Sequence, residues 1–329
     1  MEVKRKKGWV ILGSILIAIL AILTVIGFLF RDDGSLSGFV TEDGRKEYAA
    51  AYDEAMSHLP EPVESIQVNT DFGVVQLYKF QGSDTPNKTP LLLLPGKGSA
   101  TPMWEANLSG FLEHRPVYTL DLIGEPGLST ETRRIESAAD QAAWLGQVLD
   151  QLPESEIHLL GLSFGGWSAA NLALKHPEKI HSLILLDPVY VFGPIPLKMI
   201  LASIPATVPM VPKPIREKML SYISGGAEVD DSDPTAKLIE TGMRTFKSKL
   251  PMPEAIQPER LAELTIPVLG ILAGQSTMHH AEKSYQTGMD ALKDPNSEMV
   301  VFEDASHAIN GEYPKELLET IEAFLAKIE

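Results

Sequence analysis

A serine flanked by glycines ends an apolar run near the middle of the chain. The run Ile157–Leu160 leads into residues 161–166, Gly-Leu-Ser-Phe-Gly-Gly, and Trp167–His176 then has helical spacing. Glycines two residues before and two residues after the serine indicate a strand-to-helix turn too tight for a side chain at either position. Such a turn lifts the hydroxyl out of the sheet, and the helix N-terminus beneath it favours developing negative charge. The pattern predicts that Ser163 is a nucleophile. Glycine-rich turns also bind phosphate, but those typically end in Gly-Lys-Ser or Gly-Lys-Thr.

One of the eight histidines suits the base that a serine nucleophile needs. His307 follows the apolar run Met299–Phe302 on a short polar loop, before the last helical run of the chain. The pair His279-His280 invites a metal site, but adjacent side chains point in different directions and no carboxylate lies at ligand spacing. We therefore predict His307 as the base, with no metal and no cofactor. The other histidines are expected to be structural: His58, His114, His158, His176 and His181.

Four segments of the chain form a series in a fixed order. They are residues 91–98 (Leu-Leu-Leu-Leu-Pro-Gly-Lys-Gly), 121–129 (Asp-Leu-Ile-Gly-Glu-Pro-Gly-Leu-Ser), the turn at Ser163, and 304–308 (Asp-Ala-Ser-His-Ala). From about residue 65 to residue 328, roughly four-fifths of its length, the chain resembles the α/β-hydrolase superfamily. Within it, the chain is most similar to bacterial carboxylesterase-type enzymes with a cap. The resemblance implies an α/β-hydrolase fold, a catalytic role for His307, and a mainly architectural role for Asp121 and the loop 124–127.

A tetrahedral intermediate of acyl transfer needs two backbone N–H donors. One is expected from Phe164, the residue after the nucleophile. The resemblance implies that the other comes from Lys97, just after the dipeptide Pro-Gly. Family members often have His-Gly there, and the change leaves the backbone donor in place. We expect the Lys97 side chain to face solvent, with attraction of an anionic group as the alternative.

The acid that orients the base has more than one candidate. In most relatives it lies a few residues after the strand equivalent to Val268–Leu272, but this chain has Thr277 at that place and Glu282 as the next carboxylate. The superfamily also uses the end of the preceding strand, where Asp187 follows an apolar run. A carboxylate there orients the tautomer of the same histidine from the other side. We predict Asp187 as the acid. Glu282 and the loss of a functional acid are the alternatives.

The elements that must position these residues follow from the apolar pattern. From residue 91 onward, short apolar runs alternate with longer amphipathic runs, which is typical of a mostly parallel sheet flanked by helices. Two earlier runs, Ser65–Asn69 and Val74–Phe80, predict a hairpin at one edge of the sheet. Further strands are expected at 91–94, 117–120, 157–160, 180–186, 268–272 and 299–302, and helices at 48–59, 103–112, 136–151, 165–176, 280–293 and 315–328.

Nearly eighty residues separate Asp187 from Ile266 and break this alternation. So long a connection predicts an insertion with short helices of its own, expected at 197–204, 215–223 and 236–247. We predict a helical cap at 188–258 over a core of 45–187 and 259–329. The segment 188–212 is apolar with one charge, so we expect it to select apolar acyl groups through residues such as Phe192 and Ile195. The alternatives are that these residues fasten the cap to the core or rest on a bilayer.

An uncharged run of 23 residues, 8–30, follows the basic segment Lys4-Arg5-Lys6-Lys7. As a helix it would span about 34 Å, enough to cross the hydrocarbon core of a bilayer. A cleaved signal sequence would have a shorter apolar region, and a long uncleaved or atypically cleaved signal is the alternative. We predict a transmembrane signal anchor at 8–30 from its length and a linker at 31–44 from its Gly, Ser and Asp residues. The positive-inside bias places the tail at 1–7 in the cytoplasm and the catalytic domain outside it.

Composition limits the partners. The 329 residues include 28 Lys and Arg against 44 Asp and Glu, a net charge of −16, so the chain repels phosphate backbones and nucleic acid is excluded as a partner. The absence of cysteine excludes disulfides, cysteine nucleophiles and thiolate metal sites. We predict a membrane-anchored serine hydrolase that cleaves small carboxylic esters of apolar acyl groups through an acyl-enzyme. Amide, peptide or lactone substrates would share this chemistry. A binding or sensor protein with little turnover is the alternative from another functional class. The sequence does not determine the oligomeric state.

Overall fold

The structure is a computed structural model of the chain, and it describes residues 34–83, 85, 88–203, 212, 214–215, 218, 221–222 and 232–329. The chain divides into two compact units, Met1–Ser35 and Leu36–Glu329, and all elements below lie in the second. The predicted tail at 1–7 and transmembrane anchor at 8–30 lie outside the described residues. Within the part of the chain that the structure describes, no helix is both long and apolar enough to cross a bilayer.

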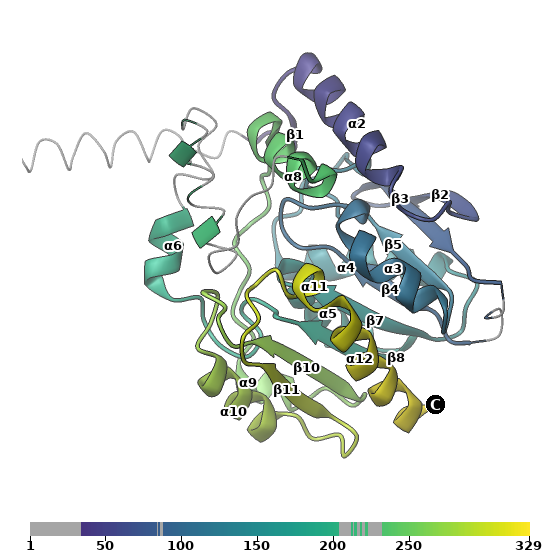
Figure 1. Cartoon of the computed structure of the whole chain (residues 1–329), viewed down its shortest axis with the longest axis vertical. Coiled ribbons are helices and arrows are strands. Elements are labelled where there is room, and N and C mark those ends of the chain that lie inside the picture. The colour runs from purple at the N-terminus through teal and green to yellow at the C-terminus, as the bar shows by residue number, and fades with distance from the viewer. Residues whose placement is uncertain are drawn as a thin grey trace, which may run out of the picture. The chain divides into compact units, whose positions relative to one another are not determined.

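Nine of the described strands form one sheet (Figure 1). Its spatial order is β2-β3-β5-β4-β7-β8-β10-β11, with β6 paired to β3. The pairs β2–β3, β3–β5 and β3–β6 are antiparallel, and the pairs from β5 to β11 are parallel. The strands are β2 (Glu64–Thr70), β3 (Gly73–Phe80), β4 (Leu91–Leu94), β5 (Val117–Leu120), β6 (Thr130–Glu131), β7 (Ile157–Leu162), β8 (Ile180–Leu186), β10 (Val268–Ala273) and β11 (Glu298–Phe302). The predicted mostly parallel sheet with an antiparallel hairpin at one edge is confirmed.

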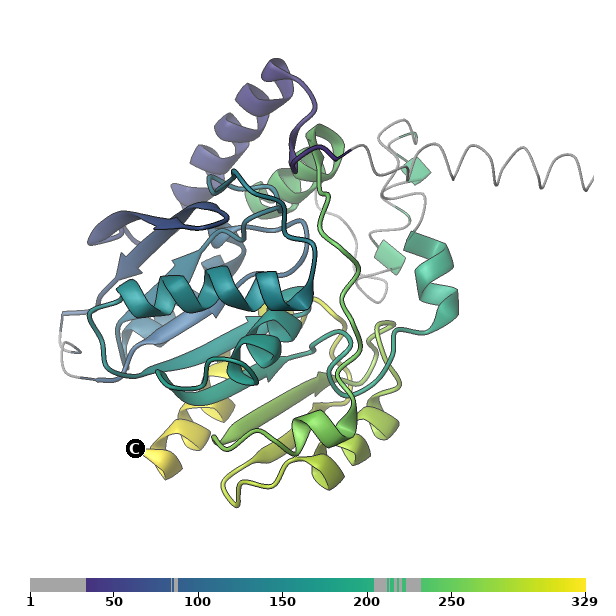
Figure 2. The same ribbon diagram turned by 180° about the vertical axis from the view of Figure 1, so that it is seen from behind.

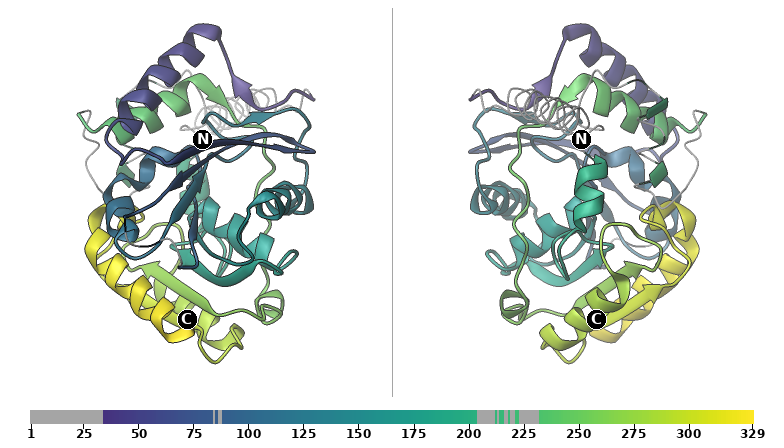
Figure 3. Two further views of the ribbon diagram at one scale, coloured as in Figure 1. Left: turned by 90° about the vertical axis from the view of Figure 1, so that its right-hand side faces the viewer. Right: turned by 90° about the vertical axis from the view of Figure 1, so that its left-hand side faces the viewer.

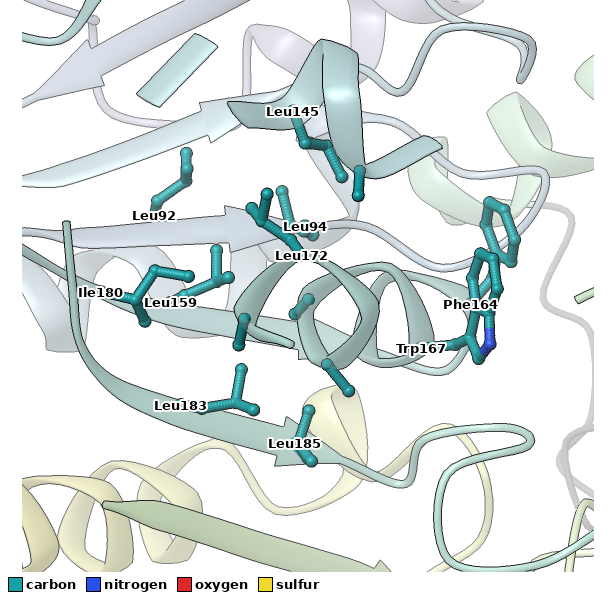
Figure 4. Close-up of a cluster of buried hydrophobic side chains, with 14 of the residues drawn as sticks. Leu92, Leu94, Leu145, Leu159, Phe164, Trp167, Leu172, Ile180, Leu183 and Leu185 are labelled. Carbon is teal, nitrogen blue, oxygen red and sulfur yellow. The ribbon is translucent and has the colours of Figure 1, made fainter. Parts of the chain in front are cut away.

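Side chains of the sheet alternate between two hydrophobic layers, one on each face. On β4, Leu92 and Leu94 belong to one layer, and Leu91 and Leu93 to the other. Because both faces are buried, the strand is continuously apolar rather than alternating. Figure 4 shows the first layer, where Leu159 lies among its neighbours on β4, β8 and α5.

Helices cover both faces of the sheet (Figures 2 and 3). The first layer includes residues of α4 (Ala138–Gln151), α5 (Phe164–Ala173), α9 (Pro258–Leu261) and α10 (Ala281–Ala291). The second includes residues of α3 (Glu105–Leu112), which follows the 3₁₀ turn η1 (Thr101–Trp104), and of α12 (Pro314–Ile328). This three-layer arrangement leaves the carboxyl ends of the parallel strands to carry a site.

Part of the predicted linker at 31–44 forms regular structure. Strand β1 (Gly38–Phe39) pairs with β9 (Phe246–Lys247), and helix α2 (Glu42–Met56) begins within that range. Thr41 caps α2, since its hydroxyl accepts the N–H of Gly44 at 3.0 Å, and two acidic residues follow in the first turn. The prediction is corrected here because the polar residues that suggested a linker are also those that start a helix.

Two helices of the 188–258 insertion have defined bounds, and the described residues 214–215, 218 and 221–222 are also helical. Helix α6 (Leu197–Ser203) and helix α8 (Pro234–Thr245) lie close to the predicted ranges 197–204 and 236–247, whereas most of 215–223 lies outside the described residues. Helix α8 packs against α2, and Lys237 pairs with Glu54 at 2.6 Å across that contact. Phe192 differs from expectation: it is 2% exposed and packs beside Gly270 of β10. It therefore fastens the insertion to the core.

Candidate active site

Ser163 stands on a strained turn between β7 and α5. Its φ of 54° lies in the left-handed region that side chains disfavour. A Cβ on Gly161 would lie 2.3 Å from the carbonyl oxygen of Gly165, and a Cβ on Gly165 would lie 2.2 Å from the carbonyl oxygen of Leu94. Both positions therefore require glycine, as the spacing predicts. The turn holds the serine at the carboxyl end of β7.

His307 lies beside this serine. It is on the loop between β11 and the short helix α11 (Ile309–Glu312), and its Nε2 is 2.9 Å from Ser163 Oγ. The Glu312 carboxylate holds the loop, since it accepts the N–H of Ser306 at 2.7 Å and the Ser306 hydroxyl at 2.6 Å. Residues 144 positions apart in the chain thus come within hydrogen-bonding distance.

Asp187 lies on the other side of the imidazole. It directly follows β8 with a φ of 40°, it is fully buried, and its Oδ2 is 2.5 Å from His307 Nδ1. Burial alone would raise the pKa of Asp187, but hydrogen bonds from His279 and His307 outweigh it and hold the pKa of this carboxyl well below its ordinary value. The carboxylate is therefore charged at neutral pH.

The charged carboxylate determines the direction of the hydrogen bonds. An ionised Asp187 can only accept, so Nδ1 of His307 carries the proton. The neutral ring then offers the Nε2 lone pair to the hydroxyl of Ser163, 2.9 Å away. This is the polarity that general-base removal of the serine proton requires.

The other two acid positions considered from the sequence lie elsewhere. Glu282 is exposed in the first turn of α10. The Thr277 hydroxyl contacts the described part of the insertion, at 3.4 Å from the carbonyl oxygen of Tyr222 and 3.6 Å from Met199 Sδ. Of Asp187, Thr277 and Glu282, Asp187 is the one that the structure brings to the histidine.

No catalytic role was predicted for His279, which the structure places on the far side of Asp187. Its Nε2 lies 2.5 Å from Asp187 Oδ1, and its side chain is 3% exposed. Its neighbour His280 is exposed, as expected for adjacent residues on opposite sides of a chain. Among the described residues, no cluster of three or more acidic, histidine or cysteine side chains could hold a metal ion. His279 lies on the loop after β10, which is the loop that carries the acid in most relatives.

The loop after β4 passes close to the serine. A Cβ on Gly96 would lie 3.6 Å from Ser163 Cβ. The backbone N–H of Phe164 starts α5, so it has no carbonyl four residues earlier within the helix to bind. The two predicted donors, Lys97 and Phe164, thus lie on the two segments that border the hydroxyl. The Lys97 ammonium also lies 5.5 Å from the centre of the Phe164 ring.

The Asp121–Ser129 segment braces this loop. Asp121 accepts the N–H of Thr101 at 2.9 Å and of Leu128 at 2.8 Å, as its expected architectural role requires. Glu125, 1% exposed, pairs with Lys97 Nζ at 2.8 Å and accepts the N–H of Gly98 at 2.8 Å. Glu125 lies in the loop 124–127 that was expected to be architectural, but its contacts with Lys97 and Gly98 were not predicted from the sequence.

Comparison with known proteins assigns the family. The profile of the alpha/beta hydrolase family matches residues 91–320, and the chain belongs to that family. Carboxylesterase YbfK of Bacillus subtilis (strain 168) is 24% identical over 306 residues, which cover 88% of this chain and 97% of that protein. The fold also matches the naproxen esterase (carboxylesterase NP) of Bacillus subtilis, with a TM-score of 0.77 at 24% identity over 87% of this chain and 99% of that one. A structure described as a membrane phospholipase A has a TM-score of 0.67 at 19% identity and covers 96% of this chain and 99% of its own.

Proposed function

We propose that the chain is a serine hydrolase of the carboxylesterase type that cleaves carboxylic esters through an acyl-enzyme. The observation that carries the proposal is the continuous hydrogen-bonded series from Asp187 through His307 to Ser163. The similarity to carboxylesterases along most of the chain supports ester substrates.

The geometry suits the following steps. Ser163 Oγ attacks the ester carbonyl carbon while its proton passes to His307 Nε2, and Asp187 stabilises the imidazolium that forms. The N–H groups of Phe164 and Lys97 stabilise the oxyanion. Collapse of the intermediate expels the alcohol, which takes the proton from Nε2, and leaves the acyl group on the serine. Water then attacks the acyl-enzyme with the same histidine as base, which releases the carboxylic acid and restores Ser163.

We propose apolar acyl groups as the preferred substrates. The ring of Phe164, directly after the nucleophile, stacks on that of Trp167, with ring centroids 5.6 Å apart; both are labelled in Figure 4. Helix α6 of the insertion contributes Met199, whose sulfur meets Thr277 on the loop that also holds His279. An apolar environment would remove acyl-chain surface from water.

We propose that residues 8–30 anchor the protein in the cell membrane with residues 1–7 in the cytoplasm and the catalytic domain outside it. The support is the uncharged run of 23 residues behind a basic segment. Fractionation of cells that express the full chain and a variant without residues 8–30 tests the anchor: only the full chain should sediment with membranes.

A fluorophosphonate probe tests the chemistry. The purified wild-type protein should be labelled on Ser163 and should hydrolyse p-nitrophenyl butyrate, and Ser163→Ala should do neither. A protein that is folded but neither labelled nor active would instead be a binding or sensor protein that has lost turnover.

A further inference from the structure

The two oxygens of the Asp187 carboxylate are divided between two histidines. His307 Nδ1 lies 2.5 Å from Oδ2, and His279 Nε2 lies 2.5 Å from Oδ1. Oδ1 also accepts the backbone N–H of Ala273 at 2.8 Å. Both His279 and Asp187 are buried, so these bonds form without competition from bulk water.

We propose that His279 is a positioning residue for the proposed hydrolysis, which holds the Asp187 carboxylate in the orientation that His307 needs. This inference rests on the proposed function of the Ser163 site. The terminal torsion of an aspartate is broad and offers little orientation of its own. The N–H of Ala273 and the ring of His279 fix Oδ1 from two directions, which leaves Oδ2 directed at His307.

The surroundings of His279 indicate a neutral ring with its proton on Nε2. Its other nitrogen, Nδ1, is buried and has no hydrogen-bond partner in the described part of the chain. A doubly protonated ring would bury an N–H there without an acceptor, which is more costly than an unused lone pair on a nitrogen. A charged His279 would also share the one carboxylate that must stabilise the imidazolium of His307 during the reaction.

Three substitutions separate donation from packing. His279→Gln keeps an N–H donor at about the reach of Nε2, His279→Leu keeps comparable bulk without a donor, and His280→Leu changes the exposed neighbour as a control. For p-nitrophenyl butyrate we expect His279→Leu to lower kcat by about 10- to 100-fold with KM within about threefold, since the ground-state contacts of the ester are unchanged. His279→Gln should recover kcat to within about fivefold of wild type, and His280→Leu should match wild type.

Proton NMR of the full-length protein with ¹⁵N-labelled histidine gives a readout independent of turnover. Short N–H bonds to a carboxylate strongly deshield the proton, so the wild type should show two such resonances, one from each ring. His279→Gln should retain only the resonance of His307, and this also shows that the variant is folded.

Distinct results overturn the inference. Wild-type kcat in a folded His279→Leu, or an equal loss of kcat in the Gln and Leu variants, would rule out orientation by donation. A wild-type spectrum with a single deshielded histidine N–H would overturn it whatever the activity. Failure of the proposed function looks different, because ester hydrolysis would then survive Ser163→Ala or be absent from the wild type.

Discussion

Glu125 accepts the backbone N–H of Gly98 at 2.8 Å and thereby fixes the loop on which Lys97 lies. The same carboxylate pairs with Lys97 Nζ at 2.8 Å and accepts the hydroxyl of Ser248 at 3.0 Å. One buried side chain thus joins the loop after β4 to Ser248 of the insertion, directly after β9. The position of the Lys97 N–H therefore depends on Glu125.

Glu125→Ala should lower kcat by about 10- to 100-fold, because an oxyanion donor that is displaced loses most of its effect. The KM should change little, since this donor acts on charge that develops in the transition state. Steady-state kinetics with p-nitrophenyl butyrate measures both constants, and the exposed Glu136→Ala is the matched control. An unchanged kcat in a folded Glu125→Ala would remove Lys97 from the oxyanion site.

Ser163→Ala should abolish ester hydrolysis and leave the fold intact, because only a hydroxyl is lost from a turn that glycines at 161 and 165 make possible. Circular dichroism should match the wild type, and activity should fall to the level of the buffer. Hydrolysis by the purified variant would exclude the serine as nucleophile.

Asp187→Asn should reduce kcat by about four orders of magnitude, since the amide favours the wrong tautomer of His307. Glu282→Gln should have less than a twofold effect, because Glu282 is exposed on α10. Single-turnover acylation of the two variants gives the comparison directly. The reverse ranking would assign the acid to Glu282, and no effect from either would show that ester hydrolysis requires neither carboxylate.

Regular elements were predictable wherever burial alone determines the sequence. Strands β4, β5 and β8 have the bounds predicted from their apolar runs, because a strand covered on both faces is mostly apolar. The two-residue strands β1 and β9 have no apolar run that would predict them, because Gly38–Phe39 and Phe246–Lys247 pair only in the folded chain.

The candidate site likewise contains residues that were predictable from the sequence and residues that were not. Ser163 was recognisable because its neighbours must be glycine, a local requirement that the sequence records. His279 lies 92 positions from Asp187, and Glu125 lies 27 positions from Gly98, so no local pattern links either pair. Both contacts are also made by residue types that commonly occur on surfaces, so the residue type alone does not indicate a buried role.

The stability should depend on the buried His158. Burial lowers its pKa to about 4 from an ordinary value of 6.5. The unfolded chain therefore takes up a proton near pH 6.5 and the folded chain only near pH 4, so the stabilisation from the neutral ring is complete above pH 6.5 and is lost as the pH falls toward 4. Glu329, whose pKa is lowered to about 2 against the opposing effect of burial, chiefly by Arg115, loses its contribution at lower pH, from 4.5 toward 2.

The free energy of unfolding should thus fall by about 2 kcal/mol from this histidine alone between pH 7.5 and pH 5. His158→Asn keeps a polar group near Ser182, to which His158 Nδ1 bonds at 2.8 Å, but has no titrating ring. Urea unfolding at the two pH values should show a smaller loss of stability for the variant than for wild type. Equal losses would contradict a neutral buried His158.

The acyl preference is the prediction that most directly tests the insertion. If its apolar residues contact the acyl chain, each methylene buried should contribute roughly 0.8 kcal/mol, or about a fourfold gain in kcat/KM, until the space is full. Esters of p-nitrophenol from butyrate to octanoate should therefore be better substrates than the acetate. Ile195→Asp should flatten this series, whereas the 69% exposed Leu197 makes Leu197→Asp a control that should not. Phe192→Asp should instead destabilise the fold, because Phe192 packs beside Gly270 in the core. A preference for acetate that Ile195→Asp leaves unchanged would show that the insertion does not contact the acyl chain.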